Sequence, residues 1–241
     1  MSQILMIAGL VFAHLCFAGE TISSPPVAGQ WKAVPNSPSL EDWSGNGHQA
    51  VSHGVPVLWR QEDLVDHPCF YLNGQGAHLE VPNARGLNPA QLSIVLWFKP
   101  PEGFIDGQRP LVLKSLETHQ EPWYQYGLFL MNDLSNPQSL AFYLNVGGVS
   151  YLVSATGLDW HRGWNHAAAT YDGGSLRLFL NGRERAVQAT PGGPIDPADT
   201  PLLIGAYANL PKDARYCFQG FIGSVTLYSG ALDRAVVETL Y

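Results

Sequence analysis

Apolar and polar residues alternate along the middle of the chain with a period of two. Every second side chain of Trp164–Tyr171 falls on one face, and the three leucines of Leu176–Leu180 repeat that spacing. This is the period of a β-strand, and a helix would not place those leucines together. Asp172–Gly174 (DGG) and Asn181-Gly182 supply the positive φ angles that hairpin turns need. The pattern predicts an antiparallel meander over residues 164–188.

Short segments of the same character recur along the chain, bounded by glycine, proline or asparagine. The predicted strands are Gln30–Val34, Val55–Trp59, Cys69–Leu72, Ala77–Val81, Leu92–Lys99, Leu111–Lys114, Tyr126–Met131, Leu140–Val146, Val149–Ser154, Leu202–Ala206 and Phe218–Tyr228. Only Leu232–Tyr241 is typical of a helix, which Asp233 can cap. Many short strands without long helices predict a β-sandwich or barrel. No linker interrupts residues 30–241, so we expect one all-β domain there.

The N-terminus has the pattern of an export signal. Ile4–Phe17 is an apolar run too short for a bilayer, which takes about 20 residues. Cys16–Ala18 offers small residues at positions −3 and −1 for cleavage after Ala18. The run lacks a basic start, and a buried strand is the alternative interpretation. We expect a signal peptide over 1–18, a flexible leader over 19–29 and no transmembrane segment after cleavage, hence a secreted, extracellular or periplasmic protein.

Composition and charge narrow the function classes. Charged residues make up 14% of the chain, below the usual quarter, while 25 Gly and 18 Pro fit frequent turns. The net charge is −7 and no basic run offsets it, which argues against nucleic acid as a partner. Removal of the signal would leave two cysteines, Cys69 and Cys217. In an oxidising compartment they can form a disulfide, although both would also fit as small buried hydrophobic residues.

Six landmarks follow one another along nearly the whole expected mature chain. They are DWSGNGHQA at Asp42–Ala50, FYLNGQGAHLEVP at Phe70–Pro82, LSIVLWFKP at Leu92–Pro100, WNHAAATYDGGSLRLFLNG at Trp164–Gly182, LLIGA at Leu202–Ala206 and FQGFIGSVTLYSGALDRAVVETLY at Phe218–Tyr241. Together they resemble the laminin-G-like jelly roll of the concanavalin A-like lectin and glucanase superfamily. The resemblance implies an all-β, two-sheet antiparallel jelly-roll sandwich with one short C-terminal helix. It also implies that the strands at Phe70 and Phe218 are neighbours, which would bring Cys69 and Cys217 within reach of a disulfide.

Catalytic groups are hard to find in the sequence. Glucanases of this superfamily carry acidic residues alternating along one strand, so that two carboxylates flank the glycosidic bond. The nearest match is Glu117–Glu121 (ETHQE), which is wholly polar and ends at Pro122, as in a solvated loop. No Gly-x-Ser-x-Gly elbow is present, and no histidine pair falls in a metal-type arrangement on a predictable face. The sequence therefore predicts a protein without enzymatic activity.

Calcium is the one candidate cofactor. Relatives often carry an Asp-Glu pair in the last core strand beside a structural calcium, whereas this chain has Gly223-Ser224 there. The remaining candidate oxygen donors are Asp42, Asn46, Asn73 and Asp172. All four are equally explained as turn residues whose side chains bond their own backbone.

Sugar recognition requires aromatic side chains with polar groups nearby, and EPWYQY at 121–126 is the best local cluster. The candidate ligand-binding residues are Trp123, Tyr124, Glu121 and His119. Tyr126 and Trp164 are expected in the interior, where aromatic residues bury large apolar areas. We therefore predict a secreted, non-catalytic recognition module that binds a glycan or an extracellular, cell-surface protein. The alternatives are a glycoside hydrolase that uses Glu117 and Glu121, and a structural or adhesion domain.

Overall fold

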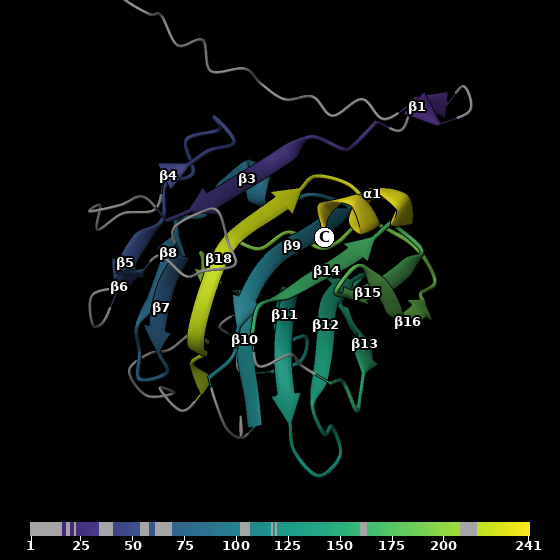
Figure 1. Cartoon of the computed structure of the whole chain (residues 1–241). Helices are drawn as coiled ribbons and strands as arrows, with labels where there is room; N and C mark the ends of the chain where they lie inside the picture. The colour runs from purple at the N-terminus through teal and green to yellow at the C-terminus, as the bar shows by residue number, and fades with distance from the viewer. Residues whose placement is uncertain are drawn as a thin grey trace, which may run out of the picture.

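Figure 1 shows the computed structural model of the chain. It describes residues 16–17, 20–21, 23–33, 41–53, 58–60, 69–101, 107–116, 118, 120–159, 163–207 and 216–241. Two antiparallel sheets face each other, and one short α-helix lies near the C-terminus (Figure 1). The predicted two-sheet jelly-roll sandwich with a C-terminal helix is therefore confirmed.

The strand order of each sheet fixes which residues become neighbours. The seven-stranded sheet runs β13 (Val149–Ala155), β12 (Ser139–Val146), β11 (Tyr124–Asn132), β10 (Gly107–Ser115), β17 (Leu202–Ile204), β8 (His78–Val81), β5 (Val51–His53). The main path of the nine-stranded sheet runs β16 (Arg183–Ala189), β15 (Ser175–Leu180), β14 (Asn165–Tyr171), β9 (Leu92–Lys99), β18 (Gln219–Tyr228), β3 (Val27–Lys32), β4 (Glu41–Asp42). Its other two strands branch from β18: β7 (Cys69–Asn73) pairs with β18, and β6 (Leu58–Arg60) pairs with β7. The short strands β1 (Cys16–Phe17) and β2 (Glu20–Thr21) pair only with each other, and η1 (Arg85–Leu87) is a single 3₁₀ turn.

The predicted meander is present as β14, β15 and β16, joined by tight turns. Asn181 and Gly182 have φ angles of 52° and 71°, as the hairpin signal requires. Ala167, Ala169 and Tyr171 of β14 point into the core, while the residues between them face outward. Alternation thus decides which side of this sheet is packed.

The hydrophobic core lies between the two sheets. On β9 the inward residues are Leu92, Ile94, Leu96 and Phe98, all fully buried. They face the inward side chains of the other sheet, such as Leu128 of β11, which is fully buried. Each such side chain contributes about 1.5–3 kcal/mol on burial, so the sandwich is held mainly by its interior. Tyr126 is buried there as predicted, and its hydroxyl donates to Leu87 O at 2.9 Å.

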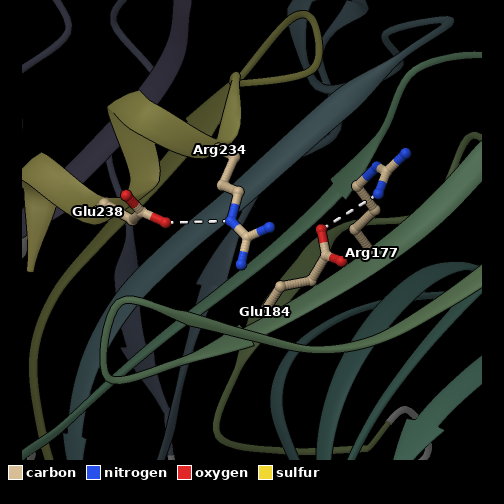
Figure 2. A network of polar contacts seen from close by, with 4 residues as sticks. All are labelled: Arg177, Glu184, Arg234 and Glu238. Atoms are coloured by element: carbon tan, nitrogen blue, oxygen red, sulfur yellow. Dashed lines mark hydrogen bonds and ion pairs between the residues drawn. The ribbon is translucent and has the colours of Figure 1, made fainter.

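The C-terminal helix α1 (Arg234–Leu240) covers the outer face of the nine-stranded sheet. Val237 of the helix packs with Val95 and Phe179 of the strands beneath it. Asp233 occupies the N-cap position, as predicted, but its side chain makes no capping hydrogen bond. Figure 2 shows two ion pairs on this side of the molecule, Arg234 with Glu238 at 3.0 Å and Arg177 with Glu184 at 3.1 Å. Exposed pairs of this kind contribute about 0–1 kcal/mol each.

The expected disulfide is not found, and strand direction explains why. Cys69 and Cys217 are both buried, and no disulfide joins them in the structure. Their strands are neighbours as expected, but they run antiparallel, with Asn73 opposite Gln219 and Phe70 opposite Ile222. Cys217 precedes β18 at the ladder end where Asn73 faces Gln219, whereas Cys69 is at the opposite end of β7. At about 3.3 Å per residue, these two ends are roughly 13 Å apart. A disulfide needs Cα atoms about 4.4–6.8 Å apart.

The N-terminal boundaries are partly corrected. Strand β3 begins at Val27, so the last residues of the predicted flexible leader belong to the nine-stranded sheet. Residues 1–15 and Ala18 lie outside the described residues, and the signal peptide stays a prediction. With seven residues, α1 is the longest helix in the described part of the chain, and no helix there has the length and apolarity of a membrane span.

Candidate functional site: an aromatic face of the seven-stranded sheet

One row of residues crosses the outer face of the seven-stranded sheet from edge to edge. In register, it consists of Val51, Glu80, Leu203, Leu113, Gly127, Tyr143 and Leu152. Residues directly opposite each other in a ladder project from the same face. The row therefore places a glutamate near one edge, apolar residues in the middle and a tyrosine toward the other edge of a single surface.

A bulge in β11 brings Tyr124 onto this outer face. The register between β10 and β11 shifts where Lys114 faces Tyr126 and Ser115 faces Tyr124. Strict alternation would put Tyr124 on the core side together with Tyr126. Instead, its ring lies 5.1 Å from the outward ring of Phe129. The bulged residue Gln125 is fully buried, and its amide has no hydrogen-bond partner among the described residues.

Five aromatic rings form a continuous group on this face, which we call the tyrosine cluster. Its members are Tyr124, Phe129, Tyr143, Tyr207 and Tyr216. Neighbouring ring centroids are 5.1–6.1 Å apart, within the usual range for aromatic pairs. Phe129 is fully buried, whereas the four tyrosines are half-buried, and the Phe129 ring contacts those of Tyr124 and Tyr143 from below.

A glycine allows the floor of the tyrosine cluster to lie close to the backbone. A Cβ at Gly127 would meet the Phe129 ring at 2.6 Å and Leu113 at 2.9 Å. Real Cβ atoms essentially never approach another heavy atom this closely. A side chain at position 127 would therefore force the Phe129 ring or Leu113 to shift.

Burial and neighbouring groups keep the hydroxyls of Tyr124 and Tyr143 protonated at neutral pH. Burial raises the pKa of Tyr143, and the carboxylates of Asp133 and Glu121 raise it further. Burial also raises the pKa of Tyr124, with smaller contributions from Tyr207 and Tyr143. Hydrogen bonds from the backbone of the following turn lower the pKa of Asp133, which is therefore ionised. The face combines neutral hydroxyls with acidic acceptors.

The predicted ligand-binding segment lies at this cluster. Tyr124 is one of its rings, Glu121 is near enough to affect Tyr143, and Trp123 is 38% exposed. His119 lies outside the described residues, as does Glu117 of the alternative carboxylate pair. Trp164, expected in the interior, is 8% exposed and packs near Phe221 on the outer face of the other sheet.

The calcium candidates do not form one site. Asp42 accepts backbone hydrogen bonds from residues 30, 44 and 48, and Asn46 donates to two backbone carbonyls. Asn73 and Asp172 each accept two N–H groups of their own turns. Asn73 lies opposite Gln219, the first residue of β18. Asp172 directly follows β14 at the other end of the sheet, where β9 pairs with Tyr228, the last residue of β18. Asn73 and Asp172 are occupied as turn residues and lie at opposite ends of the sheet, so the four candidates cannot share one ion.

Sequence reasoning missed a polar group at the other edge of the same face. His53 of β5 lies directly opposite His78 of β8, and Glu80 is two residues further along β8. Their ligand-type atoms all lie within 4.8 Å of one another. The sequence does show that His78 and Glu80 are two residues apart, so that both lie on one face of a strand. His53 joins them only through the pairing of β5 with β8, which was not predicted.

By its fold, this protein is an antiparallel jelly-roll β-sandwich. Residues 73–238 match the family model described as the concanavalin A-like lectin/glucanases superfamily, and the chain belongs to that superfamily. No curated protein sequence matches it.

Solved structures share the fold at low sequence identity. One is domain 4 of a GH43 extracellular arabinanase from Geobacillus stearothermophilus in complex with arabinotriose, with TM-score 0.68, 19% identity and coverage of 90% of this chain and 99% of that one. A second is the CBM40 of Ruminococcus gnavus IT-sialidase bound to alpha2,3 sialyllactose, with TM-score 0.57, 16% identity and coverage of 76% and 97%. A third is the binding domain of Paraclostridial Mosquitocidal Protein 1, with TM-score 0.68 and 18% identity; the match covers 89% of this chain and 51% of that chain. At these identities the likeness shows the fold.

Proposed function

We propose that this chain is a secreted, non-catalytic recognition domain that binds a glycan on the outer face of the seven-stranded sheet. The observation that carries the proposal is the tyrosine cluster. Its four half-buried tyrosines are joined by ring contacts, and the exposed Trp123 directly precedes Tyr124 in the chain.

Sugar chemistry suits such a surface. A pyranose or furanose ring has an apolar C–H face and a rim of hydroxyl groups. Aromatic rings pack against the C–H face, while tyrosine hydroxyls and carboxylates bond the rim. Glu121 and Asp133 add negative charge beside Tyr143, and the net charge of the chain is −7. Like charges disfavour an anionic ligand, so a neutral oligosaccharide is the preferred class.

The likeness to known binding domains supports the same assignment. The arabinanase domain was solved with arabinotriose and the sialidase domain with sialyllactose, so this fold carries sugars in other proteins. Fold alone does not assign function, and the tyrosine cluster supplies the local chemistry.

The test is a glycan array followed by calorimetry with arabinotriose and sialyllactose as neutral and anionic probes. We expect neutral glycans to bind, and Tyr143→Ala to weaken their affinity at least about tenfold, as for a central aromatic contact. Tyr71→Ala is the matched control, because Tyr71 is a half-buried tyrosine of β7 that packs on Phe221 in the other sheet. Equal affinity of wild type and Tyr143→Ala would contradict the site. Absence of any glycan hit would favour an extracellular protein partner instead.

The non-catalytic part of the proposal has its own assay. Prolonged incubation with each bound glycan should release no new reducing ends. If hydrolysis is seen and Glu121→Gln abolishes it, the carboxylate pair Glu117 and Glu121 is the better assignment.

Secretion rests on the apolar run Ile4–Phe17 and the small residues before Gly19. Mass spectrometry of the exported protein should find Gly19 at the N-terminus. A protein that retains Met1 would contradict the signal peptide.

A further inference from the structure

Three side chains form a polar group at the β5–β8 edge of the aromatic face, and none of them belongs to the tyrosine cluster. They are His53, His78 and Glu80, which we call the His/Glu cluster. His53 faces His78 across the ladder, and Glu80 follows two residues later on the same face of β8. The backbone pairing therefore fixes the Cα positions of the three residues relative to one another.

The donor atoms of these side chains converge. The ligand-type atoms of the three residues all lie within 4.8 Å of one another, and His53 Nε2 is 3.7 Å from Glu80 Oε2. Zinc ligands lie about 2.0–2.2 Å from the ion, which puts donor atoms of a tetrahedral site roughly 3.3–3.6 Å apart. The His/Glu cluster must close by roughly 1 Å to reach that spacing.

A second observation shows that one ligand is already oriented. His78 Nδ1 lies 2.9 Å from the carbonyl oxygen of Gly76. Since a carbonyl only accepts, Nδ1 carries the proton, and Nε2 of the neutral ring has the lone pair that binds metals. Histidine ligands of metal sites commonly donate their other nitrogen to a backbone carbonyl in this way. The Asn73 side chain holds the same loop by accepting hydrogen bonds from Gln75 N and Ala77 N.

We propose that His53, His78 and Glu80 bind one divalent transition-metal ion of the zinc type, with a fourth coordination position open to solvent. Two imidazole nitrogens and one carboxylate suit zinc, whereas calcium and magnesium prefer oxygen ligands throughout. Three protein ligands and an open position are also the usual arrangement of zinc sites that accept a further ligand.

The arrangement of the two rings indicates which side chain moves on binding. The rings of His53 and His78 are stacked 5.2 Å apart with an interplanar angle of 15°. An ion lies in the plane of each imidazole that binds it, so near-parallel rings cannot both point at one ion. His78 is buried and held by Gly76, whereas the side chains of His53 and Glu80 are 44% and 36% exposed. His53 therefore turns its ring toward the ion, and Glu80 follows.

This site lies far from Tyr143 along the shared row. Along the shared row, Leu203, Leu113 and Gly127 lie between Glu80 and Tyr143. Four interstrand steps of about 4.8 Å separate the two ends, roughly 19 Å. Tyr143 and the His/Glu cluster can therefore be tested separately by substitution.

The experiment is isothermal titration of Zn²⁺ into the purified chain after removal of metal with EDTA. We expect saturable binding of one ion per chain, unaffected by an excess of Ca²⁺ or Mg²⁺. His53→Ala and Glu80→Gln should each lower the affinity at least about tenfold, because each removes one of three ligands. His53 is exposed and Glu80 is half-buried at the surface, so these variants should keep the fold. Glu238→Gln on α1 is the matched control and should bind like the wild type.

A spectroscopic measurement gives the same answer by another route. Co²⁺ in place of Zn²⁺ should give visible absorption bands of a tetrahedral ion, and His53→Ala should lose them. The proposal is overturned by the absence of saturable Zn²⁺ binding, or by equal competition from Ca²⁺. Unchanged affinity in either His53→Ala or Glu80→Gln would also overturn the three-ligand assignment.

Discussion

Gly127 lies at the centre of the aromatic face, where a side chain would displace its neighbours. The missing Cβ leaves room for the Phe129 ring, and that ring supports Tyr124 and Tyr143 at 5.1 and 5.4 Å. A residue without any functional group thus determines the height and tilt of the proposed binding surface.

Gly127→Ala should therefore destabilise the protein by about 1–3 kcal/mol, the usual cost of forcing an added methyl group into a packed region. Urea denaturation measures this loss, and glycan affinity should fall with it. Gly163→Ala is the control, since a Cβ there would meet nothing within 4 Å. Equal stability of both variants would show that the Phe129 ring can move aside freely.

His166 is an ionisable residue on the opposite sheet that no proposed site uses. It is fully buried on β14 beside the rings of Trp97 and Tyr241, at 5.1 and 6.0 Å. Neither ring nitrogen has a hydrogen-bond partner among the described residues. Burial lowers its pKa from 6.5 to about 4, so the folded chain holds the neutral imidazole.

Because the pKa of His166 is lower in the folded chain than in the unfolded chain, the free energy of unfolding depends on pH. The unfolded chain binds the proton more readily, so the free energy of unfolding should fall as the pH drops from 6.5 toward 4. Between pH 7.5 and 4.5 the loss due to His166 is about 2–3 kcal/mol. Urea unfolding at both pH values should show that loss in the wild type and in His53→Ala, and a correspondingly smaller loss in His166→Phe. The same pH dependence in His166→Phe would rule out His166 as its source.

At the scale of strands, sequence pattern succeeded where alternation was regular. The period-two leucines of β15 and the Asn181-Gly182 turn predicted the β14–β16 meander, because local chemistry alone specifies a hairpin. The β11 bulge was not predictable in this way, since a one-residue shift reverses the face of Tyr124 without changing composition. The segment at 121–126 was recognised as a site candidate, but its partners Tyr143, Tyr207 and Tyr216 were not.

Long-range pairing explains the remaining differences from the sequence-based expectations. The family resemblance placed β7 beside β18 correctly, yet the disulfide inferred from it ignored that the strands run antiparallel. His53 belongs to β5, a strand of three residues that only its pairing with β8 reveals. Sequence therefore predicted the two sheets, while register decided which side chains meet.

At the scale of the whole molecule, the seven-stranded sheet would carry two separate functions on one face. The proposed glycan site and the proposed metal site have no shared contact along the row from Glu80 to Tyr143, and the leucines between them pack against neighbouring strands. Changes at sites more than about 7–10 Å apart without common partners usually add within about 0.5 kcal/mol. A metal at one edge should therefore leave sugar binding at the other almost unchanged.

Calorimetry of a bound glycan in the presence of EDTA, and then with saturating Zn²⁺, checks this independence. We expect the two dissociation constants to agree within about a factor of two, the equivalent of about 0.5 kcal/mol. His53→Ala should behave like the wild type in both solutions, whereas Tyr143→Ala should bind weakly in both. A tenfold loss of glycan affinity on chelation that His53→Ala reproduces would mean that the ion contacts the sugar, so that the two edges of the sheet form one extended site.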